Sequence, residues 1–394
     1  MRDYPLGAPY RLELDDTYGR LREHEPLARI KMPHGEPAWL VTRYDDVRTV
    51  FADPRFSRAA AAGRDAPRMY PEPVPGGISD LDPPEHTRMR RLVGKAFTAR
   101  RVELLRPRAE EIVEDLLDRL TAQGPPADLV EGYAVPLPAT MICELLGVPY
   151  EDRETFRSWA DAYMTTTAIP LEQKMARLGA LGGYLARLVA RRRESPTDDL
   201  IGALVQARDE QDSLSEEELI GFLMTLLAAG YETTATQIAN FSYALLTHPD
   251  QLALLRAGRV DLADAVEELL RHVPVTAIAA TFLPRYATED VQLEGGTVRA
   301  NEPVFPAYYT ANRDPQVFED PERLDLTRKP QPNFAFGHGP HFCPGAPLAR
   351  MELQVALAAL LRRLPDLRLA VPEEELSWKT GMAIRGPVAL PVTW

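Results

Sequence analysis

The sequence predicts a mainly helical fold with a minor β region, and three observations support this prediction. Residues 108–210 are a succession of amphipathic segments separated by short breaks that contain proline or glycine. Two further stretches, residues 215–247 and 347–364, are apolar on most sides and are typical of buried helices. Short alternating runs at residues 38–42 and 291–307 indicate a small amount of sheet.

Length, charge and cysteine content limit the possible classes of protein. A chain of 394 residues would by length alone suggest two or three domains, and it can bury a large cofactor. The net charge of −13 argues against a nucleic-acid binder. The N-terminus lacks an apolar signal segment, and no apolar stretch reaches the roughly 18 residues that span a membrane. We therefore expect a cytoplasmic protein without a membrane partner. Cys143 and Cys343 predict no disulfide framework, and Cys143, within the apolar run MICELLGV, is interpreted as core.

The N-terminal part of the chain predicts scaffold elements followed by a loop. The run AWLVTR predicts a strand, and Asp45 opens a helix. Residues 59–79 are rich in Ala, Gly and Pro, which is typical of a mobile loop or linker. Residues 82–108 predict a helical segment on which His86 and Arg90, four residues apart, share a face. This segment is strongly basic. A solvated face is the ordinary interpretation, and a docking surface for a small acidic electron carrier is the alternative.

The middle of the chain predicts packing helices and then one helix of unusual length. Met164 to Pro170 predicts a loop between two of the amphipathic helices. Ser215 and Glu218 have the spacing of a capping box, and the helix that they open runs to Thr247. At about 1.5 Å per residue such a helix spans on the order of 48 Å, which is long enough to cross the molecule.

The motif AGYETT, residues 229–234, is unusual inside a buried helix. Glycine costs about 1 kcal/mol relative to alanine there, and a buried carboxylate needs a partner or a proton. One interpretation is a local kink in which Glu232 is paired or reaches solvent. The other is that Glu232 and the hydroxyl of Thr233 open the helix and conduct protons to a bound ligand.

The last third of the chain mixes one helix with extended segments. DLADAVEELLRHV predicts a helix on which Glu268 and Arg271 are three residues apart, a spacing that usually means a surface ion pair. The uncharged run Val275–Thr281 predicts extended chain that lines a pocket. Val291–Ala307 predicts a small hairpin that turns at Gly295 and Gly296.

The loop FGHGPHFCPG, residues 336–345, presents Cys343 just before the helix of residues 347–364. Its glycines allow turns with positive φ and close backbone approach. A cysteine before a helix N-terminus has a lowered pKa, and its thiolate is a metal ligand or a nucleophile. The ordinary interpretation of a lone cysteine is a small buried hydrophobe.

The full pattern F-G-x-G-x-H-x-C-x-G resembles the haem-binding loop of the cytochrome P450 family. The resemblance continues in order through residues 82–90, AGYETT, E-x-x-R and Arg323, and so covers essentially the whole chain. It implies the P450 fold as a single domain over residues 1–394, with haem between the long helix and the Cys343 loop. It further implies that Cys343 is the axial thiolate ligand of the haem iron. The remaining residues implied by the resemblance are His86, Arg90, Arg285 and His341 for the haem propionates, Glu232 and Thr233 for proton supply during O–O cleavage, and Glu268, Arg271 and Arg323 as a structural ion-pair group.

By this resemblance the protein is a monooxygenase that uses haem b, dioxygen and two electrons to hydroxylate or epoxidise an apolar small molecule. The sequence as a whole resembles soluble, actinomycete-like bacterial members of the family that act on secondary metabolites such as macrolides or terpenoids. A ferredoxin-type donor with its reductase is then the electron source. The alternatives are a peroxide-driven haem oxidase, a catalytically silent haem-binding docking module and a haem-based sensor. The intact pair of Glu232 and Thr233 argues against the silent module.

Two residues depart from the family pattern. Pro344 follows the cysteine where a non-proline apolar residue is expected, and it has no N–H to donate to the thiolate. We hypothesise that this leaves the sulfur more electron-rich and lowers the iron potential. Tyr231 is larger than expected, and it either narrows the cavity or faces away.

Overall fold

The computed structural model describes residues 1–7, 11–71, 77–94, 97–149, 152–197, 199–211, 215–276 and 284–394. The chain divides into two compact units, and each is built from two separate stretches of sequence. Residues 1–87 and 267–343 form one, which we call the sheet unit. Residues 88–266 and 344–394 form the other, the helical unit. The organisation as one domain stays a prediction. Among the described residues, no helix is both long enough and apolar enough to cross a membrane.

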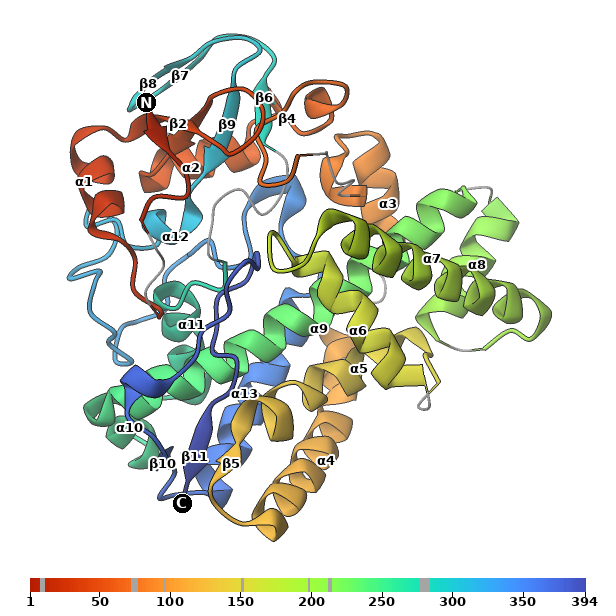
Figure 1. Ribbon diagram of the computed structural model, residues 1–394, viewed down its shortest axis with the longest axis vertical. Helices are drawn as coiled ribbons and strands as arrows, with labels where there is room; N and C mark the ends of the chain where they lie inside the picture. The colour runs from red at the N-terminus through yellow and green to blue at the C-terminus, as the bar shows by residue number, and fades with distance from the viewer. Residues whose placement is uncertain are drawn as a thin grey trace. The chain divides into compact units, whose positions relative to one another are not determined.

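The sheet unit contains a six-stranded sheet, a two-stranded hairpin and short helices (Figure 1). The strand order in the large sheet is β1-β2-β3-β9-β6-β4, and β3 pairs in parallel with β9. The elements are β1 (Arg2–Asp3), α1 (Asp16–His24), β2 (Leu27–Lys31), β3 (Ala38–Val41), α2 (Tyr44–Ala52), β4 (Phe56–Ser57), the 3₁₀ turns η1 (Ala59–Ala61) and η2 (Gly77–Asp80), β6 (Arg285–Ala287), β7 (Val291–Leu293), β8 (Gly296–Val298), β9 (Pro303–Pro306), α12 (Tyr308–Ala311) and η5 (Gly339–His341).

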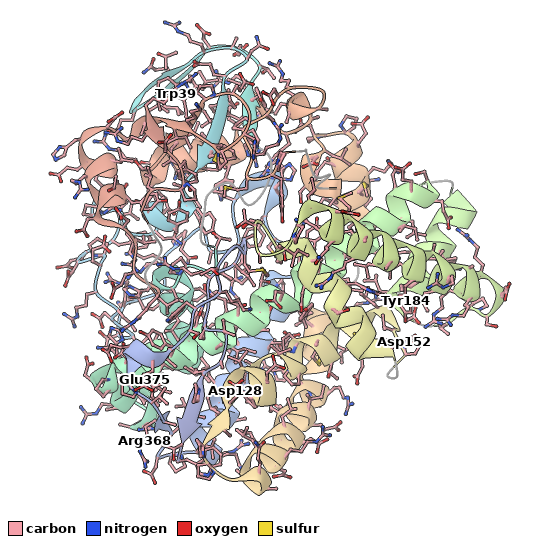
Figure 2. The ribbon with its side chains drawn as sticks, viewed as in Figure 1. Trp39, Asp128, Asp152, Tyr184, Arg368 and Glu375 are labelled. Atoms are coloured by element: carbon pink, nitrogen blue, oxygen red, sulfur yellow. The ribbon has the colours of Figure 1, made fainter. Side chains whose placement is uncertain are left out.

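Both faces of this sheet are buried, because successive strand residues alternate between two cores. Leu40 and Phe305 join a core that includes α1, whereas Val41 and Val304 join a core that includes α2. The period of two along a strand produces this division. Trp39, labelled in Figure 2, donates from Nε1 to Glu302 Oε2 at 2.7 Å, which ties β3 to the start of β9.

The helical unit contains most of the helices and a three-stranded sheet of order β10-β11-β5. Its elements are α4 (Ala99–Gln123), β5 (Ala127–Asp128), the π-turn η3 (Val130–Ala134), α5 (Pro136–Leu146), α6 (Arg153–Met164), α7 (Leu171–Glu194), α8 (Leu200–Gln211), α9 (Glu216–Thr247), α10 (Pro249–Arg256), α13 (Ala346–Arg363), β10 (Arg368–Leu369), η6 (Glu373–Glu375) and β11 (Pro391–Thr393). Helices α3 (Glu85–Gly94) and α11 (Leu262–His272) each contain a boundary between the units.

Helix α9 forms the core of the helical unit, as the sequence predicts. Ser215 caps it, and both hydrogen bonds of the capping box with Glu218 are present. The helix is buried along most of its length and packs against α5, α6, α7 and α13. Asp152, at the N-cap of α6, accepts a hydrogen bond of 2.7 Å from Tyr184 of α7, and Figure 2 labels both residues. Cys143 is fully buried, so its assignment to the core is confirmed.

The segments that were expected to be extended are only partly as predicted. The predicted hairpin exists as β7 and β8, but residues 303–306 do not extend it. They form β9 in the six-stranded sheet, because their fully apolar run is suited to burial on both faces. Most of the run Val275–Thr281 and part of the loop at residues 59–79 lie outside the described residues.

Candidate active site

The glycine-rich loop places Cys343 at the end of the sheet unit. The Cys343 N–H donates to the carbonyl of Phe336 at 2.9 Å, which closes the loop on itself. Gly339 has a φ of +69°, and a Cβ there would lie 2.7 Å from the carbonyl oxygen of Phe51 in α2. Only glycine permits this approach, so the loop is seated against α2 by its own sequence. Helix α13 begins at Ala346, one residue before the predicted start.

His86 and His341 come together although they are distant in sequence. Their ring centroids are 4.0 Å apart, and the rings are tilted by 35°. His86 is buried in the first turn of α3, whose N-terminus is fixed by a hydrogen bond from the His86 N–H to the Asp82 carbonyl. His341 lies in η5, two residues before Cys343. The two predicted propionate-binding histidines thus form one pair, and His341 places this pair two residues from Cys343 in the chain.

Arg285 is buried and incompletely paired. It lies on β6, which pairs with both β9 and β4. Its Nη1 donates to the Phe56 carbonyl at 3.2 Å, and its guanidinium lies 5.7 Å from the ring centroid of Phe51. Nε and Nη2 have no partner among the described residues. Burial and the positive charge of Arg58 lower the pKa of Arg285 to about 9.

Arg58 was not predicted from the sequence. It is 9% exposed, and burial lowers its pKa, which Asp80 and Asp82 counteract. The Asp82 carboxylate also accepts hydrogen bonds from the backbone N–H groups of Arg58 and Ala59, at 2.9 and 3.3 Å. Arg58 thus adds a second buried positive charge that acts on Arg285, and both guanidinium groups could hold an anion. The only sequence signal is an arginine directly after a short strand, which is too common to be informative.

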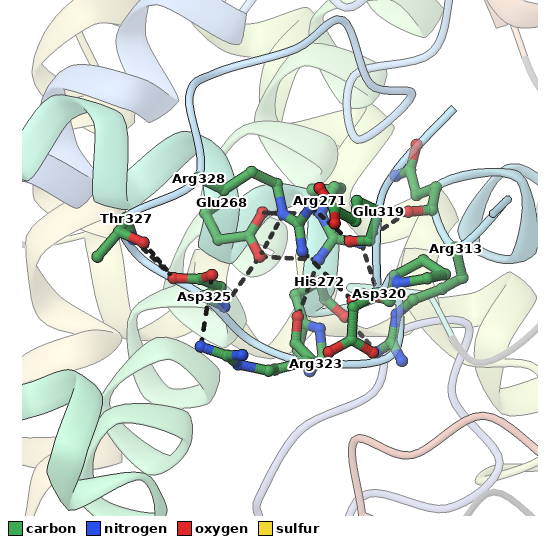
Figure 3. Close-up of polar contacts among 12 residues, drawn as sticks. Glu268, Arg271, His272, Arg313, Glu319, Asp320, Arg323, Asp325, Thr327 and Arg328 are labelled. Atoms are coloured by element: carbon green, nitrogen blue, oxygen red, sulfur yellow. Dashed lines mark hydrogen bonds and ion pairs between the residues drawn. The ribbon is translucent and has the colours of Figure 1, made fainter. Parts of the chain in front are cut away.

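The E-x-x-R pair is buried rather than exposed, and Figure 3 shows its network. Arg271 donates to both oxygens of Glu268, at 2.7 and 2.8 Å, and both side chains are 2% exposed. The expectation that Arg323 is the third member was wrong. Arg328 supplies the guanidinium, 3.3 Å from Glu268, whereas the Arg323 side chain is 61% exposed and pairs with Asp325. Arg323 contributes its backbone carbonyl, which accepts from Arg271 at 3.3 Å.

The AGYETT motif lies in the helical unit, within α9. The helix is continuous through the motif, so the expected opening is not seen. Thr233 Oγ1 donates to the Ala229 carbonyl at 2.7 Å, one turn earlier. Glu232 is 5% exposed and accepts a hydrogen bond of 2.6 Å from Lys379 Nζ, which the sequence did not predict. Glu232 is therefore paired, as the first interpretation expected, but the helix is not interrupted by the kink that this interpretation included.

The neighbours of Glu232 explain two unusual residues of the motif. Tyr231 is fully buried, and its hydroxyl donates to the carboxylate of Asp161 in α6. A Cβ on Gly230 would lie 3.1 Å from Ile142 of α5. The glycine thus permits close packing of α5 on α9, and the tyrosine joins α9 to α6.

Arg90 lies on α3, in the part that belongs to the helical unit, and is half-buried. Within the same basic segment several arginines are already paired with carboxylates. Arg88 binds Glu218, Arg106 binds Glu103 and Arg108 binds Glu111 and Glu144. Arg108 is exposed in spite of these pairs, and Arg91, Arg100 and Arg101 are exposed as well.

The residues of the sheet unit fit haem. A haem of the thiolate type needs a cysteine as axial ligand, and its two propionates need donors and positive charge. Cys343 would supply the thiolate, and His341, two residues before it, forms the ring pair with His86. In the described part of the chain the buried Nε and Nη2 of Arg285 have no acceptor, and a propionate would supply one.

Comparisons with known proteins identify the family. The family model described as Cytochrome P450 matches residues 155–257 and 262–375. The chain is 52% identical to the mycinamicin IV hydroxylase/epoxidase of Micromonospora griseorubida, over 100% of this chain and 98% of that protein. It is 49% identical to the nocardicin C N-oxygenase of Nocardia uniformis subsp. tsuyamanensis, over 100% of this chain and 98% of that protein.

A solved structure, HinD with NMFT and NO, superimposes with a TM-score of 0.96 at 53% identity, and covers 100% of this chain and 99% of that chain. The mainly helical fold with a minor β region is therefore confirmed as the P450 fold. Relatives named as a hydroxylase/epoxidase and an N-oxygenase share nearly their whole length with this chain. The chain belongs to the cytochrome P450 family and is a haem-thiolate monooxygenase that uses dioxygen and a redox partner to oxidise a small molecule.

Proposed function

We propose that this monooxygenase hydroxylates or epoxidises an apolar secondary metabolite, with a macrolide or another polyketide as the first candidate and a terpenoid as the second. The observation that carries this proposal is the 52% identity, over the whole chain, to a protein named mycinamicin IV hydroxylase/epoxidase. The run Val275–Thr281, which is expected to line the pocket, carries only Val, Thr, Ala and Ile side chains, which suit an apolar ligand.

We assign the cofactor as haem b, with Cys343 as the axial thiolate. When bound, the haem supplies the iron at which dioxygen is activated. His86, Arg90, Arg285 and His341 bind the propionates, and we add Arg58 to this group. The support for this assignment is the buried positive charge of Arg58 and Arg285 and the two unpartnered nitrogens of Arg285. Anionic propionates would remove the cost of burying both arginines.

Glu232 and Thr233 supply the protons that O–O cleavage consumes. Glu232 is the acid in this proposal, because it is a buried carboxyl group next to Thr233 on α9 and can exchange a proton with its Lys379 partner. Thr233 passes the proton on, because its hydroxyl can accept one hydrogen bond while it donates another. In the ground state this hydroxyl donates to the Ala229 carbonyl, so it must rotate before it can donate elsewhere.

The electron donor in this proposal is a ferredoxin-type protein with its reductase. Ferredoxins are small and acidic, and Arg91, Arg100 and Arg101 are exposed basic residues close together in the chain. Replacing Arg100 and Arg101 by glutamate should lower the association rate with a ferredoxin and weaken its dependence on salt. Unchanged reduction kinetics at low salt would remove this surface from the proposal.

The ligand assignment is tested by the absorption spectrum of the reduced, carbon-monoxide-bound protein. Wild type should show the red-shifted Soret band of thiolate ligation, and Cys343→Ser should lose it. Cys143→Ala is the matched control, because Cys143 is fully buried in the helical unit and should leave the band unchanged. A thiolate band that survives in Cys343→Ser would contradict the assignment.

The substrate class is tested by binding and by product. A panel of macrolides, other polyketides and terpenoids, beginning with mycinamicin IV, should be titrated into the holoenzyme while the Soret band is recorded. Compounds that shift the band should then be turned over with a surrogate ferredoxin and reductase, with hydrogen peroxide alone as a parallel reaction. A product that gains one oxygen atom supports the proposal. Turnover with peroxide only would identify a peroxide-driven oxidase, and shifts confined to a different chemical class would replace the substrate assignment.

A further inference from the structure

The buried carboxylate of Glu232 is held by a residue far away in sequence. Lys379 Nζ lies 2.6 Å from Glu232 Oε1 and 3.2 Å from Thr236 Oγ1. The Glu232 side chain is 7% exposed and that of Lys379 is 19% exposed. Separating a pair buried to this extent costs free energy, because each charge is then left uncompensated. The position of each side chain therefore restricts the position of the other.

Lys379 belongs to a segment, residues 377–388, that is fixed on α9 at several points. The Asn240 side-chain amide donates to the Arg385 carbonyl at 2.7 Å, and Lys379 N–H donates to the Gly386 carbonyl at 2.9 Å. A Cβ on Gly386 would lie 2.7 Å from Thr236 Cγ2, so the segment touches the helix surface there. Glu232, Thr236 and Asn240 follow one another at intervals of four and form one face of α9. The segment therefore contacts this face over two helical turns.

The same segment is anchored again at its tip. The Gly381 carbonyl accepts hydrogen bonds from the N–H groups of Thr166, Thr167 and Ala168, at 2.7, 2.8 and 3.0 Å. Gly381 has a φ of +65°, and a Cβ there would lie 2.5 Å from the Ala168 nitrogen. Ala383 N–H donates to the Met164 carbonyl at 2.7 Å. The Lys379 backbone is thus held from both sides, which limits how far its ammonium can follow a displaced carboxylate.

We propose that Lys379 is a positioning residue for proton delivery and that it acts by holding Glu232 in place. Its ammonium holds the carboxylate at one point on α9 and, as the more exposed partner, connects it to solvent. This inference rests on the proposed role of Glu232. Without the ammonium, the carboxylate is no longer held at this point, and it supplies protons too slowly for O–O cleavage. The two electrons and two protons that should yield one oxygenated product and one water then leave with dioxygen as hydrogen peroxide.

The variants are Lys379→Met, Lys379→Arg and Lys379→Met combined with Glu232→Gln, with Lys329→Met as the control because Lys329 is exposed. The test compound is the one that gives the largest Soret shift in the screen above, used with a surrogate ferredoxin and reductase. Lys379→Met should lower product per NADPH about tenfold, raise peroxide correspondingly and leave KM and the spectral Kd unchanged. Lys379→Arg should restore most of the product, and Lys329→Met should match wild type.

The midpoint of thermal unfolding gives a readout that does not depend on turnover. Lys379→Met should lower the midpoint, and adding Glu232→Gln should recover part of the loss, because no carboxylate then remains buried without its partner. The inference would be overturned if the two substitutions lowered the unfolding midpoint additively, or if Lys379→Met gave as much product per NADPH as wild type. Wild type without a thiolate band or without product would instead defeat the proposed function, and the unfolding measurements would still decide whether Lys379 positions Glu232.

Discussion

Replacing Arg285 by methionine should change two properties of the protein in opposite directions. In the haem-free protein the guanidinium is buried, and its Nε and Nη2 lack a partner among the residues that the structure describes, at a cost of about 1–3 kcal/mol for each. Its hydrogen bond to the Phe56 carbonyl offsets about 1.5–3 kcal/mol, and the Phe51 ring offsets about 0.5–1 kcal/mol. Methionine fills a similar volume without these donors. We therefore expect Arg285→Met to stabilise the haem-free protein by about 1 kcal/mol.

With haem bound, the same replacement removes a buried partner of the propionates. Breaking a buried ion pair costs about 3–5 kcal/mol, which corresponds to at least about 100-fold faster loss of haem. The assays are urea unfolding of the haem-free protein and transfer of haem to a heme-free globin acceptor. Destabilisation of the haem-free protein together with unchanged haem loss would refute the reasoning and make Arg285 a structural residue.

Arg271 is the matched control, because it is an equally buried arginine whose nitrogens all have partners. Arg271→Met should destabilise the haem-free protein strongly. The pH dependence gives a second check. Because burial and Arg58 lower the pKa of Arg285 to about 9, the unfolded chain binds more protons above that pH. The stability of the haem-free protein should therefore rise as the pH increases beyond about 9, and Arg285→Met should remove this rise.

Three further predictions concern other parts of the chain. Glu268→Gln should destabilise the protein by about 3–5 kcal/mol in denaturant unfolding, because it leaves Arg271 buried without its carboxylate. Arg323→Met should cost less than about 1 kcal/mol, and a loss similar to that of Glu268→Gln would mean that the Arg323 side chain belongs to the network. Burial raises the pKa of Glu352 to about 8, so stability should fall by on the order of 4–5 kcal/mol as the pH rises from about 4.5 to 8, and Glu352→Gln should flatten this profile; a wild-type profile in Glu352→Gln would contradict the assignment. Pro344→Leu should raise the reduction potential of the haem in a redox titration, because the new N–H can donate to the thiolate, and an unchanged or lower potential would exclude this effect.

The sequence predicted elements well where a terminus is marked by a specific residue. Ser215 and Glu218 determine the start of α9 through two local hydrogen bonds, and local bonds can be inferred from spacing. Pro347 predicted the start of α13 to within one residue. The pairing of Glu268 with Arg271 was predictable for the same reason, since both lie on one helix.

Contacts made through irregular chain were not predictable. Arg323 and Arg328 lie in the same meander, and no periodicity indicates which side chain turns inward; the path of the backbone decides. Lys379 is 147 residues from Glu232, and its partner depends on a segment without regular secondary structure. A buried carboxylate could be predicted to need a partner, but the identity of that partner required the tertiary structure.

The composition of the sheet unit has a consequence for the order in which the protein folds during synthesis. Strand β3 pairs with β9, Trp39 opposite Val304, so the central pairing of the large sheet joins residues translated far apart in time. Pairing of such high contact order is slow, and it cannot begin until about three quarters of the chain has left the ribosome. Until then β2 and β3 expose apolar faces and an unpaired strand edge. The nascent N-terminal segment is therefore the part of this protein that depends most on protection from aggregation. The second stretch of the sheet unit, residues 267–343, is complete only when Cys343 has been translated.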